Sequence, residues 1–341
     1  MNLIAELSEL KRKVDFNTYD ISVKEIITMV SEGIINIAPE YQRQFRWKSD
    51  RQSQLIESIL LGIPVPSLFM ATNLDGTWEV IDGVQRLNSI IHFGGFPDAR
   101  AKVQLTSQLK LHDLNKLKSF NGKYFDDLPK SIQLDFLLKP LKITTLSDKS
   151  DMDVRFDLFE RLNTGGIILT NQEIRSCVYR GRFNDYLKDL AHNENFNQCV
   201  RLTSTQEADG TREEYVLRFF AFLYNYQNFE HSVVDFLNGF MSESMKRFEY
   251  NEASRIFNQT FDQLVALPQG ITRNRKTTPA NLFEAVAVGA AFAIHEVGHI
   301  RTENVEWMTS PELRALTTGA TNTRSKVIGR IEFCRDRFAG R

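Results

Sequence analysis

The chain has 341 residues, of which 42% are hydrophobic, 11% aromatic and 25% charged, and its formal net charge is −1. This is the composition of an ordinary soluble globular protein of about two domains. The charge leaves no global field that draws the protein to nucleic acid, so any DNA contact must come from local patches. Three distant cysteines exclude a disulfide framework and a zinc ribbon. Without a recognisable signal peptide or an apolar run long enough for a bilayer, we expect a cytoplasmic protein with no membrane partner.

The first half of the chain mixes predicted helices and strands. Apolar residues at helical spacing, with polar starts and glycine stops, predict helices over residues 22–31, 49–61 and 83–93. Short apolar runs bounded by turn residues predict strands over residues 66–71, 77–81 and 141–146.

The second half is predicted to be helical throughout. The segments are 151–163, 170–179, 182–192, 211–226, 231–248, 250–266, 279–297, 302–317 and 323–338. The excess of 25 phenylalanines is expected in the core of these helices. We therefore expect an α/β domain over residues 1–150 and an all-α helical lobe over residues 151–341.

Residues 78–86 lead a buried strand through a glycine turn directly into a helix. Such a turn presents free backbone N–H groups and the positive end of the helix dipole, which favour an anion. Gly83 lets a phosphate approach the backbone, Arg86 offers a fork of donors, and Asp82 is suited to cap the helix or hold Mg²⁺ through water. Plain turn chemistry explains the same residues, because the segment is neither a Walker A loop nor G-x-G-x-x-G.

Four blocks of sequence, in a fixed order, resemble the N-terminal domain family of GmrSD-type restriction proteins. The turn at Asp82-Gly83-Val84-Gln85-Arg86 is similar to the Asp-Gly-Gln-Gln-Arg signature of that family, itself similar to the phosphate motif of ParB-type CTPases. The other blocks are residues 39–47 with 55–66, residues 159–166 with 169–175, and residues 212–219. Val84 departs from the pattern, since the family has glutamine there.

The resemblance implies an α+β fold with a ParB/sulfiredoxin-like N-terminal domain that binds a nucleoside triphosphate and Mg²⁺. It assigns catalytic roles to Asp82, Gln85 and Arg86. It implies nucleotide binding by Tyr41, Gln42, Arg43, Arg46, Asp82, Gly83, Gln85, Arg86, Asn163, Thr164 and Gly165, and metal binding by Glu160 and Asn163. If the missing glutamine orients water, hydrolysis is weak here although binding persists.

The chemistry of the other candidate residues agrees with these roles and leaves alternatives open. Loop arginines beside Tyr41 and Trp47 are suited to grip phosphates or stack on a base, or to form surface ion pairs over an aromatic anchor. Glu160 and Asn163, three residues apart on one helical face, are suited to hydrated magnesium or a ribose. A helix C-cap formed by Asn163 and Gly165 is the other explanation.

Residues 295–299, His-Glu-Val-Gly-His, fit the zinc-protease pattern H-E-x-x-H if both histidines share one helical face. Against a zinc site, the metzincin extension is missing and Arg301 is charged where zincin helices continue apolar. Packing or surface histidines are the alternative.

Two basic runs are candidates for DNA contact, although such residues more often form a solvated face or a subunit interface. One covers residues 273–276, and the other comprises Arg324, Lys326, Arg330, Arg335, Arg337 and Arg341.

The sequence favours a nucleotide-binding sensor or regulator of a GmrSD-type anti-phage restriction system, acting as a metal-dependent NTPase. Restriction relatives carry an HNH nuclease domain after this one. None is recognised here, so we expect DNA cleavage to depend on a separate nuclease subunit, and relatives suggest a homodimer. The alternative is a non-hydrolysing DNA-binding adaptor with a ParB-like fold, and a zinc metallopeptidase is the remote one.

Overall fold

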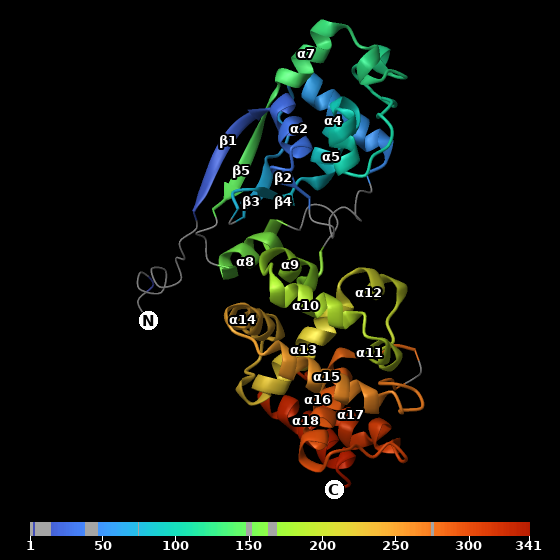
Figure 1. Ribbon diagram of the computed structural model, residues 1–341. Helices are drawn as coiled ribbons and strands as arrows, with labels where there is room; N and C mark the ends of the chain where they lie inside the picture. Colours follow the sequence, from blue (N-terminus) through green and yellow to red (C-terminus); the bar gives the residue numbers. More distant parts are fainter. Residues whose placement is uncertain are drawn as a thin grey trace. The chain divides into compact units, whose positions relative to one another are not determined.

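The computed structural model describes residue 3 and residues 15–37, 47–73, 75–147, 152–162, 169–273 and 276–341. The chain forms two compact units, Met1–Ile168 and Leu169–Arg341 (Figure 1). Unit 1 contains a mixed sheet with helices, and unit 2, as far as it is described, is built from helices. The expected α+β class with a helical second part is thus confirmed.

The sheet of unit 1 has five strands in the order β1-β5-β3-β4-β2. Strand β1 (Phe16–Ser22) pairs antiparallel with β5 (Pro140–Leu146), and β3 (Leu68–Thr72) runs parallel to β5. Strand β4 (Trp78–Asp82) is antiparallel to β3 and parallel to the short β2 (Ile35–Asn36). The sequence did not predict β1, because five of its seven residues are exposed in succession and show no alternation.

Helices α2 (Val23–Ser31), α4 (Ser49–Leu60) and α5 (Val84–Gly94) follow the sequence prediction closely. Ser22 caps α2 by accepting a hydrogen bond from the Glu25 amide, as its position predicted. The other helices of this unit are α6 (Pro97–Lys102), η1 (Lys118–Phe120), η2 (Phe125–Asp127), α7 (Lys130–Leu138) and α8 (Met152–Leu162). Helix α8 packs against β4 and so belongs to unit 1.

A buried carboxylate on α4 fixes the long connection that follows α6. Glu57 Oε1 accepts hydrogen bonds from the amides of Lys116 at 2.8 Å and Leu117 at 2.7 Å. One turn earlier on the helix, Ser53 Oγ accepts a hydrogen bond from the His112 amide at 3.2 Å. Because buried backbone amides need partners, these polar residues on the inner face of α4 are part of the fold.

Unit 2 packs around the apolar helix α16 (Ala280–Val297). By length and composition α16 alone among the described helices could cross a membrane, but 67% of it is buried as a core helix of this unit. The other helices are α9 (Asn171–Val178), α10 (Arg182–Ala191), α11 (Glu194–Cys199), α12 (Ser204–Ala208), α13 (Thr211–Asn225), η3 (Tyr226–Asn228), α14 (Val233–Lys246), α15 (Tyr250–Leu264), η4 (Glu306–Thr309), α17 (Pro311–Thr317) and α18 (Arg324–Phe338).

Phenylalanines fill much of this helical core, as expected. Phe257 lies 4.5 Å from Phe261 and 5.4 Å from Phe219, measured between ring centroids, and all three are fully buried. All three cysteines are buried and none is disulfide-bonded, as expected. The predicted helix over 302–317 is wrong as one element: η4 ends before Pro311, which begins α17, since proline suits the first turn of a helix.

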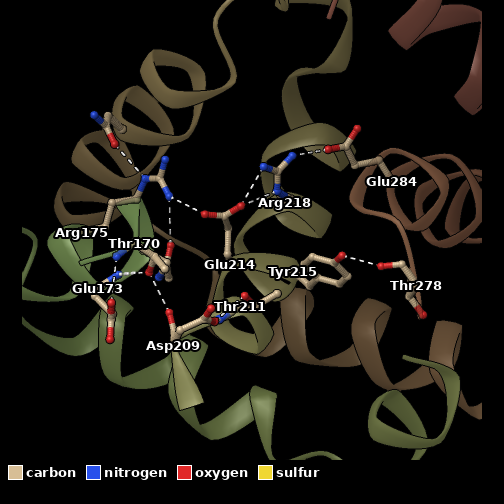
Figure 2. Close-up of polar contacts among 12 residues, drawn as sticks. Thr170, Glu173, Arg175, Asp209, Thr211, Glu214, Tyr215, Arg218, Thr278 and Glu284 are labelled. Carbon is tan, nitrogen blue, oxygen red and sulfur yellow. Dashed lines mark hydrogen bonds and ion pairs between the residues drawn. The ribbon is translucent and has the colours of Figure 1, made fainter. Parts of the chain in front are cut away.

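A chain of alternating charges runs through unit 2 (Figure 2). Arg175 Nη1 lies 3.0 Å from Glu214 Oε2, and the other oxygen of Glu214 accepts a hydrogen bond from Arg218 Nε at 2.8 Å. Arg218 Nη1 lies 2.5 Å from Glu284, which also pairs with Arg330. The chain therefore links α9, α13, α16 and α18.

Each member of this chain is held by partners on both sides. Burial raises the pKa of the Glu214 carboxyl, but Arg218 and Arg175 outweigh burial and hold that pKa below its ordinary value of 4.5. Arg175 is 1% exposed and also donates from Nε to Asn238 Oδ1 at 2.8 Å. Removing one partner would leave a buried charge uncompensated, which is costly.

Replacing Glu214 by glutamine should lower the free energy of unfolding of the protein by about 3–5 kcal/mol, because Arg175 and Arg218 lose their shared counter-charge. Urea denaturation followed by far-UV circular dichroism measures the change. The matched control is Glu213→Gln on the same helix, for which no ion pair is seen among the described residues. Equal effects of the two substitutions would contradict the structural role of the charge chain.

The same carboxylate predicts an acid dependence. Since the folded-state pKa of Glu214 lies below 4.5, its contribution to stability is present above that pH and is lost as the pH falls through the folded value. The wild-type protein should therefore lose stability more steeply than Glu214→Gln on acidification below pH 4.5. Denaturation curves measured over an acid pH series test this, and parallel curves would refute it.

Candidate functional site

The candidate site lies where β4 turns into α5. Asp82 ends the strand, Gly83 adopts φ 103° and ψ 11°, and Val84 begins the helix. Just before the turn the pairing of β3 with β4 shifts: Phe69 pairs with Asp82 while the next residue, Met70, pairs with Val80. Strand β4 therefore carries one extra residue, Ile81, and such a bulge re-aims the side chain beside it.

Gly83 is required by space as well as by backbone conformation. A Cβ atom at this position would lie 2.4 Å from Cδ2 of the buried Leu68. It would also lie 3.2 Å from Arg86 Nη2 and 3.3 Å from Arg86 Nε, so the guanidinium group rests against the turn. The positive φ is strained for other residues. The turn thus places the Arg86 guanidinium next to the backbone of Gly83, which carries no side chain.

Asp82 and Arg86 form an ion pair across the turn. Arg86 Nη2 lies 2.6 Å from Asp82 Oδ2. The Arg86 side chain is 12% exposed and that of Asp82 37%, so the carboxylate is the more accessible partner. The two predicted site residues are therefore brought together, and each satisfies the other in this structure.

The first turn of α5 has no side-chain cap. The first helical hydrogen bond runs from the Leu87 amide to the Gly83 carbonyl at 2.8 Å. The amides of Val84 and Arg86 precede that bond and have no acceptor among the residues that the structure describes. Together with the helix dipole they form a positive backbone surface that is suited to an anion.

Gln85 contacts the backbone of Trp47, and its predicted roles in binding and catalysis stay predictions. Its Oε1 accepts a hydrogen bond from the Trp47 amide at 3.1 Å. Gln52 Nε2 donates to the Trp47 carbonyl at 2.7 Å, and Gln52 Oε1 lies 2.8 Å from His92 Nδ1. Gln85 and Gln52 therefore attach the backbone of Trp47 to α5 and α4.

The protonation state of His92 follows from this network. Burial and the nearby Arg100 lower the pKa of His92, so the ring is neutral at neutral pH. Because Gln52 Oε1 can only accept, Nδ1 of His92 carries the proton and donates it. Sequence reasoning missed Gln52 and His92; the available signal was a polar residue at a core-facing position of α4, beside Leu55 and Ile56.

Val84 belongs to the core of unit 1. Its side chain is 7% exposed and occupies the first position of α5. The residue that replaces the first glutamine of the family signature is therefore buried, and it has no polar group to offer a ligand or a water molecule.

The remaining predicted site residues divide into two groups. Glu160 is exposed on α8, whose Phe156 and Phe159 are buried. No group of three or more His, Cys, Asp or Glu suited to a metal ion occurs in the described part of the chain. Outside the described residues lie Tyr41, Gln42, Arg43, Arg46, Asn163, Thr164 and Gly165.

The zinc-protease pattern does not form in unit 2. Helix α16 ends at Val297, and Gly298 follows with φ 82°, so His299 lies beyond the helix that carries His295. His299 Nδ1 instead contacts the Val297 carbonyl at 3.1 Å, and Glu296 pairs with Arg341. The expectation of two histidines on one helical face is wrong, because a C-capping glycine separates them.

The C-terminal basic run is largely internal or paired. Arg330 is fully buried against Glu284, and Arg335 lies 2.9 Å from Asp336. Arg337 lies over the Phe333 ring at 5.2 Å. The expectation of a basic face on α18 is therefore partly wrong. Arg330 and Arg335 pair with carboxylates of unit 2, so the basic residues do not form a continuous exposed patch.

Unit 1 defines a class of domain in which a mixed sheet leads through a glycine turn into an uncapped helix. Residues 23–180 match the family described as "GmrSD restriction endonuclease, N-terminal domain". The match includes the turn at Gly83 and ends before the fourth block, residues 212–219. The recognition made from the sequence is thus confirmed for these residues.

A solved structure, "Structure of the C2221 form of Pnob8-like ParB-N domain", is also similar to this chain. It is 12% identical, covers 95% of this chain and 96% of its own, and has a TM-score of 0.24. None of the curated proteins matches the chain.

Replacing Gly83 by alanine should destabilise unit 1 more than the same change at Gly76. Both glycines have positive φ, at 103° and 84°, which costs alanine about 1–3 kcal/mol. Only at position 83 does the new methyl group also meet Leu68 and Arg86, since no described atom lies within 4 Å of it at position 76. Urea denaturation of both variants measures the difference. Equal losses would show that the turn is not sterically constrained.

Proposed function

We propose that the turn between β4 and α5 binds a nucleoside triphosphate with Mg²⁺, in a protein of a GmrSD-type anti-phage restriction system. The observation that carries the proposal is that the Arg86 guanidinium and the free amides of Val84 and Arg86 lie at the same uncapped helix start. The match of residues 23–180 to the GmrSD N-terminal family supports restriction as the setting. Because restriction acts on DNA, we propose DNA and a separate nuclease subunit as the partners. The proposed location is the cytoplasm.

A phosphate group at this turn would exchange partners with the existing ion pair. Phosphate oxygens accept two parallel hydrogen bonds from a guanidinium, so a phosphate competes with Asp82 for Arg86. The backbone amides of α5 add donors that Asp82 does not use. Since Asp82 is the more exposed partner, it can turn away without uncovering the core.

The released carboxylate suits the metal ion that accompanies a nucleotide. Asp82 and the exposed Glu160 of α8 carry the hard oxygen donors that Mg²⁺ prefers. One or two such carboxylates suffice, because phosphates and water complete the coordination of Mg²⁺. When bound, the ion would neutralise charge on the phosphates, while the chain's own residues position them.

The block that precedes Trp47 is proposed to complete the pocket. Arg46 is the residue before Trp47 in the sequence, and Gln85 and Gln52 hold both polar groups of the Trp47 backbone. Gln85 is therefore a positioning residue in this proposal. With Arg43 and Tyr41, that block would supply the further phosphate donors and an aromatic ring for the base.

A non-hydrolysing DNA-binding adaptor is the second candidate. The observation that favours it is the burial of Val84, which offers no polar group to orient an attacking water at the position where the family has glutamine. Binding at the turn does not need that group, because Arg86 and the backbone amides supply the donors. The two candidates therefore share the binding site and differ in turnover.

Nucleotide binding and turnover are separable in one experiment. Labelled ATP, GTP and CTP, each with Mg²⁺, are titrated into the full chain, and released phosphate is followed in the same samples. Arg86→Ala should weaken binding at least about tenfold, because a charge-assisted hydrogen bond is lost. Lys142→Ala, which removes one exposed positive charge from β5 of the same unit, should bind normally.

The outcomes distinguish the candidates. Phosphate release that is lost in Arg86→Ala supports the hydrolase, and tight binding without release supports the adaptor. If no nucleotide binds the wild-type protein, or if Arg86→Ala binds as well as Lys142→Ala, the proposed site is wrong.

A further inference from the structure

A cavity of about 370 Å³ opens in unit 2 between α13, α15 and α16. It lies on helices that the proposed nucleotide site does not use. One of its lining residues is His295, the first histidine of the pattern that failed to form a zinc site. The cavity is large enough for a small organic ligand.

Aromatic and aliphatic side chains form much of the wall. Tyr224, Ile256 and Phe292 all line the cavity. The Tyr224 ring stacks on Phe220 with an interplanar angle of 10° and on Phe240 with an angle of 18°, and these neighbours fix its plane. A wall of held aromatic rings favours a flat ligand that can stack.

The charged residue at the cavity is already neutralised. Arg255 donates to Glu252 from Nε at 3.0 Å and from Nη2 at 2.6 Å, and from Nη1 to Gln259 Oε1 at 3.2 Å. Its hydrogen bonds hold the pKa of Glu252 below the ordinary value, so this carboxylate stays ionised beside the cavity. An anionic ligand would have to compete with Glu252 for Arg255.

Three polar groups remain for a ligand. They are the Tyr224 hydroxyl, the Gln259 amide nitrogen and the His295 ring, and within the described residues none has a hydrogen-bond partner. Burial, Tyr186 and Glu252 raise the pKa of Tyr224 to about 12, so its hydroxyl remains a donor at neutral pH. The side chains of Gln259 and His295, both exposed, add hydrogen-bond donors and acceptors.

We propose that this cavity binds a neutral, planar nitrogen heterocycle of the nucleobase or nucleoside type. The ligand ring stacks on Tyr224 and Phe292. Its polar atoms form hydrogen bonds with Tyr224, Gln259 and His295. A phosphorylated ligand would have to displace Glu252 from Arg255 without help from free backbone amides, because the lining residues lie inside helices. The site is separate from the turn at Gly83, so unit 2 provides the protein with a second ligand.

Isothermal titration calorimetry on the full chain tests the site with adenosine, guanosine, cytidine and thymidine, and with AMP as the charged comparison. At least one nucleoside should bind, and AMP should bind more weakly than adenosine. Gln259→Leu and His295→Leu should each weaken nucleoside binding about tenfold, the effect of a lost hydrogen bond. His299→Leu, which changes an exposed histidine outside the cavity, should not alter it.

Nucleoside binding should also survive Arg86→Ala, which alters only the proposed nucleotide site. The proposal is overturned if no nucleoside binds at millimolar concentration, or if AMP binds more tightly than adenosine. It is equally overturned if Gln259→Leu and His295→Leu bind as the wild type does while retaining its thermal unfolding midpoint. Failure of nucleotide binding at Arg86 leaves this test unaffected, because the probes and the variants differ.

Discussion

The backbone of Gly83 determines what unit 1 can offer a ligand. Its left-handed conformation turns β4 into α5 without a capping side chain, and the absence of a Cβ lets Leu68 and the Arg86 guanidinium close on the turn. Free amides, a helix dipole and a cation therefore lie within one turn of helix. In this structure the Asp82 carboxylate accepts a hydrogen bond from Arg86, and a bound phosphate would have to take its place.

Polar residues in the sequence blocks serve two separate purposes. Those at the turn remain at or near the surface, whereas Arg175 and Glu214, from the third and fourth blocks, lie in the charge chain of unit 2. Thr170 likewise caps α9 and donates to the Asp209 carbonyl at 2.7 Å. Charged residues of these blocks thus form the proposed ligand site in one unit and connect packed helices in the other.

Periodicity and capping residues predicted α2, α4 and α5 within one or two residues, because their apolar faces and start signals lie in the local sequence. Strand β1 was missed because its pairing partner, β5, lies more than a hundred residues away and its own pattern does not alternate. The turn at Gly83 was found correctly as a strand–helix junction. That Arg86 pairs with Asp82, and Gln85 with Trp47, depends on side-chain packing that spacing does not encode. The predicted helix over 279–297 ends where α16 does, so His299 already lay outside it, and the H-E-x-x-H interpretation overlooked that boundary.

A structure of the full chain with a non-hydrolysable nucleoside triphosphate and Mg²⁺ tests the central claim most directly. The account predicts a phosphate within hydrogen-bond distance of the Val84 and Arg86 amides, with Arg86 moved from Asp82 onto a phosphate oxygen. A nucleotide bound elsewhere, with the Asp82 to Arg86 ion pair intact, would contradict it.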